Sequence, residues 1–165
     1  IAITLALETP EFSVHAIERS PNALAVAQQN ARALGAENIQ WHLGSWWDAL
    51  PPTAPRFDLI VSNPPYIARD DHHLQQGDLR FEPPQALAAG SDGLDDLRIL
   101  AGGAPHWLKP GGWLLLEHGH NQAPAVRALL AAAGFARVQS RRDLAGIERC
   151  SGGQWPAGPA RIQQA

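Results

Sequence analysis

The sequence predicts an α/β fold, a mostly parallel sheet with helices on both faces. Strand-like and helix-like segments alternate along the chain, as they do in parallel sheets connected by crossover helices. The apolar run from Phe57 to Ser62 is too short for a helix and too continuous for a half-exposed strand, which is typical of a central parallel strand. Polar side chains follow several of the predicted strands, where sheets of this kind bind ligands.

The first part of the chain separates clearly into helices and strands. Ser20 has the chemistry of a helix cap, and Pro21 suits the first helical turn. Apolar residues then recur at helical spacing as far as Gly35, which supplies the stop. The predicted elements are the remainder of a helix over 1–9, a strand over 13–17 that ends at Glu18, a helix over 21–34 and a strand over 39–43.

Prolines and glycines punctuate the rest of the chain. The loop over 44–56 contains three prolines, and the polar segment from Asn63 to about Leu87 is long enough to indicate a functional or disordered loop. Lys109 to Gly112 is predicted to form a turn. The remaining predicted elements are a helix over 94–107, a strand over 113–117, a helix over 124–133 closed by Gly134 and a strand over 135–140.

Length and composition favour one soluble domain over 1–165, in which the residues after about 155 have no assignment. Hydrophobic residues make up 45% of the 165 residues and charged residues 18%. No apolar run approaches the length of a membrane span, so we expect no membrane partner. The single cysteine, Cys150, fits a reducing cytoplasm, and the net charge of −3 argues against direct nucleic-acid binding. We expect a cytoplasmic monomer.

Glu18 is the first candidate binding residue. It closes a predicted strand directly before a helix, where a carboxylate accepts hydrogen bonds from the ribose hydroxyls of a nucleotide-like ligand. The alternative is that Glu18 stabilises the following helix through the helix dipole. The residues themselves leave both interpretations open.

The tetrapeptide Asn63-Pro64-Pro65-Tyr66 carries the most specific chemistry. A turn is the simple interpretation, but a turn requires neither two prolines nor an aromatic residue. The Asn63 side-chain oxygen and the Pro64 carbonyl can accept both N–H groups of a planar amide or amine, which makes its nitrogen lone pair available. The prolines hold these acceptors rigidly, and Tyr66 offers a flat face for the acceptor group or for a cation.

An Asn-Pro-Pro-Tyr sequence after an apolar strand resembles the signature of Rossmann-like amino methyltransferases. That group includes the adenine N6 methyltransferases and the glutamine N5 methyltransferases of peptide-chain release factors. The flanking sequence resembles the HemK/PrmC release-factor glutamine methyltransferases, and the resemblance extends to about Trp155. The segments that carry it are 57–67, 74–83, 114–119 and 143–149.

The resemblance implies a class I methyltransferase fold that uses S-adenosylmethionine, leaves S-adenosylhomocysteine and needs no metal. It implies that Glu18 binds the ribose of the cofactor and that Trp47 packs on its adenine. Trp46 stands where relatives often carry an acidic residue near the adenine. It also implies that Asn63 to Tyr66 hold the target glutamine amide near the methyl donor. The implied catalytic residues are Asn63, Pro64 and Tyr66; Pro65 joins them in binding substrate, and Asn63 also lies beside the cofactor.

Two features of the family do not occur in this sequence. These are the glycine-rich loop that approaches the methionine end of the cofactor, with the strand before it, and the helical N-terminal domain that helps to recognise the release factor. Because Ile1 opens in the middle of a helical pattern, we expect an upstream segment that contains an apolar strand and a glycine-rich turn. We expect that strand to lie between the strand that ends at Glu18 and the strand that ends at Ser62.

Other candidate sites have simpler explanations. The histidines, among them His72, His73 and His118, show no metal-ligand spacing, and we interpret them as solvated or packing residues. Cys150 is predicted to be structural. Gly152 to Gln154 repeats the tripeptide that the family modifies in its substrate, and we interpret it as a strand-end turn.

These observations predict methyl transfer from S-adenosylmethionine to the N5 amide nitrogen of the Gly-Gly-Gln glutamine in a release factor, a modification that acts in translation termination. One alternative is an adenine N6 methyltransferase that acts on DNA or RNA. A second is a truncated, non-catalytic domain that binds a partner.

Overall fold

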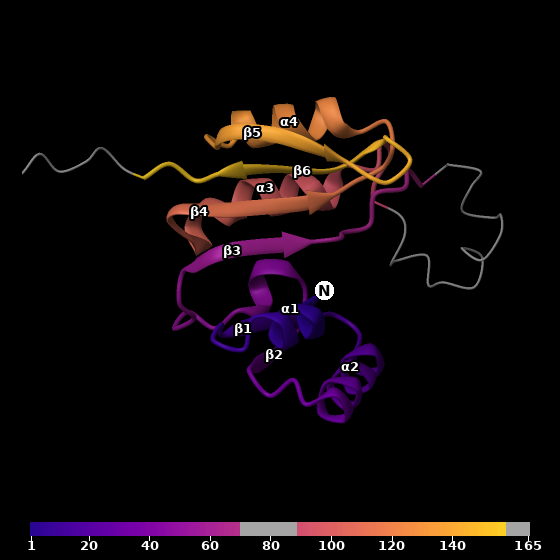
Figure 1. Cartoon of the computed structure of the whole chain (residues 1–165). Helices are drawn as coiled ribbons and strands as arrows, with labels where there is room; N and C mark the ends of the chain where they lie inside the picture. The colour runs from indigo at the N-terminus through magenta and orange to yellow at the C-terminus, as the bar shows by residue number, and fades with distance from the viewer. Residues whose placement is uncertain (70–88, 158–165) are drawn as a thin grey trace, which may run out of the picture. The chain divides into compact units, whose positions relative to one another are not determined.

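The computed structural model describes residues 1–69 and 89–157, and the chain divides into two compact units (Figure 1). The first unit is Ile1–Ala54 and the second is Pro55–Ala165. The expectation of one domain over the whole chain stays a prediction. The family-like segment 74–83 and the pair His72–His73 lie outside the described residues.

The first unit contains two parallel strands and two helices. Strand β1 pairs in parallel with β2, so that Glu18 lies opposite Leu43 at the carboxyl ends of both strands. Helices α1 and α2 both contact this pair of strands. The elements are α1 (Ala2–Glu8), β1 (Val14–Glu18), α2 (Pro21–Leu34), β2 (Ile39–Leu43) and a short 3-10 helix (Trp46–Ala49). The predicted elements of this unit are therefore confirmed, and the 3-10 helix adds structure to the predicted loop.

Local capping explains the limits of α2. The Ser20 hydroxyl accepts a hydrogen bond of 3.3 Å from the Ala23 N–H, and Pro21 occupies the first turn, where it interrupts no helical hydrogen bond. Gly35 ends the helix with a φ of 76°, a left-handed conformation that glycine adopts without steric penalty. Small side chains let this helix pack closely in the core of the unit, which is built from Ala6, Ala31 and Ala36 with Ile3, Val14, Ile39 and Trp41 around them.

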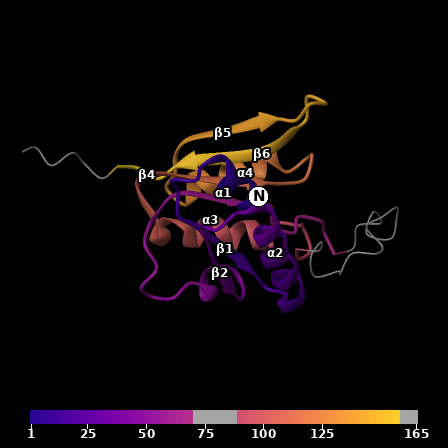
Figure 2. The ribbon, with the colours of Figure 1, turned by 60° about the horizontal axis from the view of Figure 1, so that its bottom comes forward.

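The second unit is built on a four-stranded mixed sheet with the strand order β3-β4-β6-β5. Strand β3 pairs with β4 in parallel, whereas β6 runs antiparallel to both of its neighbours. Figure 2 shows β5 and β6 side by side, joined by a hairpin loop. The elements are β3 (Phe57–Ser62), α3 (Asp95–Trp107), β4 (Leu108–Glu117), α4 (Ala123–Ala132), β5 (Ala136–Arg142) and β6 (Glu148–Gln154).

The core of the second unit lies where α3 and α4 meet each other and the sheet. Helix α3 contacts β4, and α4 contacts β5 and β6. The apolar residues of the helices recur every three or four positions, which produces one buried face on each helix. Each buried leucine stabilises the unit by roughly 1.5–3 kcal/mol relative to an exposed one. The fully buried large side chains include Leu97, Leu108, Leu114, Leu116, Val126 and Leu130.

The predicted turn at Lys109 to Gly112 is wrong, because β4 begins at Leu108 and includes these residues. The pairing with β3 is irregular here: Phe57 lies opposite Leu108, and Leu59 already lies opposite Trp113. Gly111 has a φ of 85°, which suits such a bulge. The turn-forming residues therefore produce a bulge within a strand, held by a hydrogen bond of 2.9 Å from the Gly111 N–H to the Trp155 carbonyl.

The predicted strand-end turn at Gly152 to Gln154 is also wrong, because these residues belong to β6. Gly152 lies opposite Leu115, and Gly153 lies opposite Leu114. A Cβ atom on Gly152 would lie 2.7 Å from the Leu114 carbonyl oxygen, closer than packing allows. Gly152 therefore lets β6 approach β4, whereas a Cβ atom on Gly153 would lie 2.8 Å from the Cβ of Phe135. Close packing explains both glycines without any role as a methylation target.

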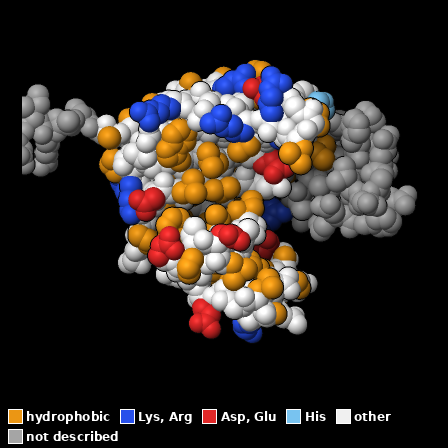
Figure 3. Space-filling view, viewed as in Figure 1, with side chains coloured by type: hydrophobic (Ala, Val, Ile, Leu, Met, Phe, Trp, Pro, Cys, Tyr) orange, Lys and Arg blue, Asp and Glu red, His pale blue; other side chains and the backbone are white. Residues whose placement is uncertain are grey.

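Strand β5 forms one edge of this sheet and carries exposed arginines. Positive side chains gather over β5 and α4, at the top of Figure 3. Arg137 has a φ of 52° beside a shift in the β5–β6 register, and bulges and charges of this kind discourage edge strands from pairing with other chains. The exposed arginines of β5 are Arg137, Arg141 and Arg142.

Among the described strands, β3 pairs with β4 alone, so the expected second neighbour of β3 stays a prediction. Within 1–69 and 89–157, no helix is long and apolar enough to cross a membrane.

Candidate active site

Glu18 and the two tryptophans lie at the same edge of the first unit. Glu18 ends β1, and Trp46 and Trp47 begin the 3-10 helix that follows β2. The Gly44 N–H donates a hydrogen bond of 3.0 Å to the Glu18 carbonyl, which joins the two strand ends directly. The three residues that the sequence predicts to contact a cofactor are therefore gathered at the carboxyl ends of two parallel strands, where α/β sheets bind ligands.

The Glu18 carboxylate has one partner within the chain. Its Oε1 atom accepts a hydrogen bond of 2.7 Å from the Ser20 N–H, at the start of α2. This contact supports the structural interpretation of Glu18 at a helix N-terminus. A carboxylate offers about four acceptor positions, however, and the half-buried Glu18 side chain keeps the capacity to accept hydroxyl donors as well.

Trp46 adopts an unusual backbone conformation, with a φ of 46°. Left-handed conformations are uncommon for a bulky residue and often occur at functional sites. Both Trp46 and Trp47 are half-buried. Their predicted contacts with an adenine ring stay predictions.

The second unit places Asn63 at a corresponding strand end. Asn63 directly follows β3, and Ser62 lies opposite Leu116 in the neighbouring parallel strand, so that Asn63 and Glu117 end adjacent strands. The Asn63 side chain is exposed and makes no hydrogen bond to another described residue, whereas Pro64 is fully buried. The tetrapeptide therefore has a buried, rigid proline beside an exposed amide.

Tyr66 is held by a residue that the sequence did not indicate as functional. The Arg149 guanidinium, from the start of β6, donates a hydrogen bond of 2.9 Å to the Tyr66 hydroxyl and lies 5.4 Å from the centre of its ring. Glu117 lies 3.8 Å from the same guanidinium. The Tyr66 ring therefore already interacts with a cation of this chain, and its predicted contact with an acceptor group or a second cation stays a prediction.

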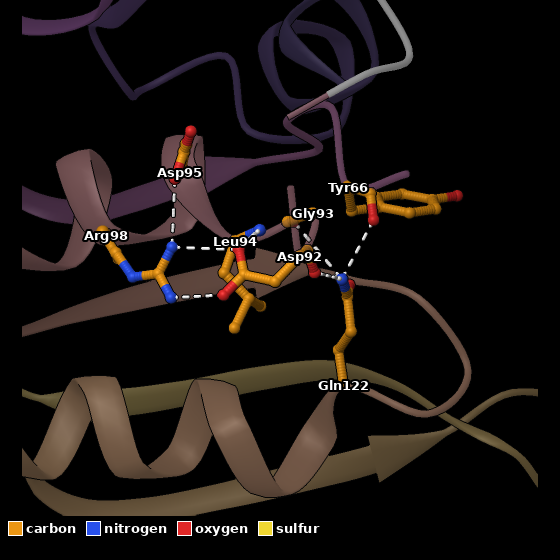
Figure 4. A network of polar contacts seen from close by, with 7 residues as sticks. All are labelled: Tyr66, Asp92, Gly93, Leu94, Asp95, Arg98 and Gln122. Carbon is orange, nitrogen blue, oxygen red and sulfur yellow. Dashed lines mark hydrogen bonds and ion pairs between the residues drawn. The ribbon is translucent and has the colours of Figure 1, made fainter. Parts of the chain in front are cut away.

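Gln122 joins three segments at this strand end (Figure 4). Its Nε2 donates a hydrogen bond of 2.9 Å to the Tyr66 carbonyl and lies 3.3 Å from the Gly93 carbonyl oxygen and 3.4 Å from that of Asp92. Its Oε1 accepts a hydrogen bond of 2.7 Å from the Gly119 N–H. The sequence around Gln122 shows no pattern that would identify it as a site residue, because its hydrogen-bond partners come from three separate segments.

An ion pair orders the segment that Gln122 contacts before α3. Asp92 accepts hydrogen bonds from the Arg98 guanidinium and, at 3.1 Å, from the Leu94 N–H (Figure 4). The hydrogen bond from Arg98, supported by the one from Leu94, lowers the pKa of Asp92 to about 2. Asp95 also binds Arg98, with 3.0 Å between its carboxylate and the guanidinium. The network holds the chain just ahead of α3 in one conformation.

His118 is a buried packing residue, as the sequence predicted. Its ring nitrogens lie 2.9 Å from the Gly119 carbonyl oxygen and 2.8 Å from the Ser151 hydroxyl. Within the described parts of the chain, no group of three or more His, Cys, Asp or Glu side chains is arranged to hold a metal ion. Cys150 lies near the start of β6. Burial and the nearby Glu117 charge raise the pKa of its thiol, which is therefore poorly suited to nucleophilic catalysis.

The chain has the features of a Rossmann-like methyltransferase domain. In an α/β fold, one strand ends at a carboxylate with spare acceptor capacity, and another is followed by an exposed asparagine and a rigid proline pair. The chain belongs to the methyltransferase domain family, which matches residues 1–150.

The sequence is similar to two curated bacterial enzymes named release factor glutamine methyltransferase. The identity to the protein from Xylella fastidiosa is 53% over 156 residues, which cover 94% of this chain and 56% of the relative. The identity to the protein from Bordetella pertussis is 58% over 153 residues, which cover 93% of this chain and 56% of the relative. The resemblance stated from the motifs is therefore confirmed, and the chain spans about half the length of the curated relatives that it matches.

Solved structures confirm the fold. A methyltransferase from Pyrococcus furiosus has a TM-score of 0.66 at 17% identity and covers 92% of this chain and 68% of its own. An O-methyltransferase family protein from Burkholderia thailandensis has a TM-score of 0.64 at 14% identity, over 95% of this chain and 48% of its own. The predicted α/β, Rossmann-like class I methyltransferase fold is thus shown.

Proposed function

We propose that this chain transfers a methyl group from S-adenosylmethionine to the N5 amide nitrogen of the glutamine in the Gly-Gly-Gln motif of a peptide-chain release factor. The observation that carries this proposal is the exposed Asn63 amide at the carboxyl end of β3, followed by the buried Pro64, in a chain 53% and 58% identical to enzymes of that name. The partner is the release factor itself.

The tetrapeptide supplies the chemistry that an amide acceptor needs. A glutamine amide nitrogen is a poor nucleophile because its lone pair is delocalised into the carbonyl group. The Asn63 side-chain oxygen and the Pro64 carbonyl accept its two N–H groups and favour a tetrahedral nitrogen, whose lone pair then points away from the carbonyl. Burial of Pro64 and the two fixed proline φ angles hold these acceptors in place before the substrate arrives.

The residues of the first unit fit the methyl donor. S-adenosylmethionine supplies a methyl group on a positively charged sulfur, ready for displacement by a nucleophile. Glu18 keeps acceptor capacity for two ribose hydroxyls beside its bond to Ser20, and Trp46 and Trp47 are aromatic groups suited to an adenine ring. The task of these residues is alignment, which alone can lower a barrier by about 7–11 kcal/mol.

The test is methyl transfer with tritiated S-adenosylmethionine, using the protein in the longest form that its gene encodes. A release factor or peptide that contains Gly-Gly-Gln should become labelled, and the same substrate with glutamate in place of the glutamine should not. Adenine-containing oligonucleotides should remain unlabelled at near-physiological salt.

Two results would overturn the proposal. Labelling of the oligonucleotides with an unlabelled release factor would show an adenine methyltransferase instead. No labelling of either substrate, together with no binding of S-adenosylmethionine in calorimetry, would show a domain without catalytic function.

A further inference from the structure

Gln122 lies outside the tetrapeptide but contacts it through the Tyr66 backbone. It is the residue before α4, yet its side chain makes no capping hydrogen bond to that helix. The side chain extends instead to Tyr66, 56 residues earlier in the chain, where its Nε2 donates to the main-chain carbonyl at 2.9 Å. Figure 4 shows the amide between Tyr66 and the segment from Asp92 to Leu94.

The partners of Gln122 determine which way its amide points. The Gly119 N–H can only donate, and it lies 2.7 Å from Oε1. The carbonyls of Tyr66, Asp92 and Gly93 can only accept, and all three face Nε2. Rotation of the amide by half a turn would place oxygen against three oxygens and N–H against N–H. Both ends of the amide therefore bind backbone groups of the chain.

Gly93 packs closely against this contact. Gly93 is buried with a φ of 73°, and a Cβ atom at this position would fall against the Tyr66 carbonyl oxygen and lie 2.8 Å from the Gln122 amide nitrogen. Asp92 holds the same turn from its other side through Arg98 and the Leu94 N–H. The Tyr66 carbonyl is thus enclosed between Gly93 and Gln122.

The tetrapeptide gains rigidity where its prolines cannot provide it. The rings of Pro64 and Pro65 restrict φ at these two residues only, so the backbone is free to rotate again at Tyr66. Gln122 fixes the Tyr66 carbonyl, and Arg149 fixes the Tyr66 hydroxyl at 2.9 Å. The tetrapeptide is thus held at its Tyr66 end by two residues from other parts of the chain.

We propose that Gln122 is a positioning residue for methyl transfer: by holding the Tyr66 carbonyl, it keeps the Asn63 and Pro64 acceptors aligned on the target amide. The proposal rests on the proposed function. Gln122 makes no contact with the reacting atoms, and its effect is on turnover, because a displacement of about 1 Å in a catalytic group can lower the rate by roughly 10²-fold.

The most informative variant is Gln122→Glu. It keeps the shape of the side chain and the acceptor for the Gly119 N–H, but it replaces the donating NH₂ group with a carboxylate oxygen that faces three carbonyls. We expect kcat to fall about 10²-fold at pH 8 with little change in KM for S-adenosylmethionine. As the pH falls and the introduced carboxyl is protonated, it regains one donor, so the ratio of variant to wild-type kcat should rise. Gln139→Glu adds the same charge to an exposed side chain of β5 and should match the wild type throughout.

A second measurement does not depend on activity. Tyr66 is the only tyrosine of this sequence, so tyrosine labelled with ¹³C at its carbonyl gives a signal that Tyr66→Phe assigns. The chemical shift of that carbonyl reports its hydrogen bond. It should move in Gln122→Glu at pH 8, return as the pH falls, and stay unchanged in Gln139→Glu.

The outcomes separate the two proposals. An unmoved carbonyl signal, or a moved signal with wild-type kcat, would overturn the role of Gln122. Absence of methyl transfer in the wild type would overturn the proposed function. In that case a moved signal would still establish that Gln122 anchors Tyr66, but the catalytic role would be lost with the reaction.

Discussion

The Arg149 guanidinium donates a hydrogen bond of 2.9 Å to the Tyr66 hydroxyl, joining residues 83 positions apart. The two come from different strand ends: Tyr66 follows β3, and Arg149 is the second residue of β6, which runs antiparallel to β4. The antiparallel direction of β6 is what brings its first residues to the edge where β3 and β4 end. This geometry connects the site after β3 to β6, although β4 lies between these two strands in the sheet.

The first prediction concerns the contribution of the Tyr66–Arg149 contact to the free energy of unfolding. A double-mutant cycle of Tyr66→Phe and Arg149→Met should give a coupling free energy toward the lower end of about 0.5–3 kcal/mol, because both side chains are only half-buried. Urea unfolding of the four proteins provides the measurement. The exposed Lys109–Asp58 pair, 2.7 Å apart, is the control and should couple by about 0.2–1 kcal/mol. A coupling of zero between Tyr66 and Arg149 would contradict the contact.

The second prediction concerns the acceptor role of Asn63. Asn63→Ala removes one preorganised acceptor from an exposed position, so we expect kcat to fall by roughly 10²–10³ while the melting temperature stays near that of the wild type. Labelled methyl transfer and a thermal melt on the same samples measure the two effects. Asn30→Ala, on the exposed side of α2, is the matched control and should change neither. If Asn63→Ala retains most of its turnover, Asn63 is not an acceptor for the amide.

The third prediction distinguishes two glycines of the second unit. Gly152→Ala should destabilise the protein by about 1–3 kcal/mol, because the new Cβ atom would lie 2.5 Å from a methyl group of Leu115 and 2.7 Å from the Leu114 carbonyl oxygen. Gly102→Ala, within α3, meets nothing within 4 Å and should stabilise it by up to about 1 kcal/mol. Chemical denaturation compares the two. Equal effects would show that β6 does not lie as close to β4 as described.

The fourth prediction is a pH dependence that arises from Asp92. The Arg98 hydrogen bond and the Leu94 N–H lower the pKa of Asp92 from 3.8 to about 2 in the folded chain. The folded state therefore favours the ionised form, so the stabilisation is complete above pH 3.8 and is lost as the pH falls toward 2.

Asp92→Asn tests this dependence. The difference in unfolding free energy between the wild type and the variant should be constant near pH 6 and should shrink steadily between about pH 4 and pH 2. Urea titrations at closely spaced pH values measure it. A difference that does not change over this range would show that the Asp92–Arg98 pair does not shift the ionisation of Asp92.

Local signals in the sequence determined the elements of the chain and the main features of the candidate site. Ser20, Pro21 and Gly35 act through neighbours within one helical turn, so the limits of α2 could be predicted without knowledge of the rest of the molecule. Asn63 to Tyr66 is a continuous segment after a strand, and its donors, acceptors and prolines can be identified from residue type alone. The methyltransferase fold followed from the alternation of elements and from these motifs.

Only the tertiary structure determined which distant residues support the site. Lys109 to Gly112 has the composition of a turn, but pairing with β3 draws it into a bulged strand. Gly152 lets β6 pass close to β4, and Gly153 lets it pass close to Phe135. Gln122 and Arg149 contact Tyr66 across 56 and 83 residues, and no local pattern distinguishes them from other polar residues. Propensity and capping act over a few residues, whereas close packing and backbone hydrogen bonds between segments exist only once the chain has folded.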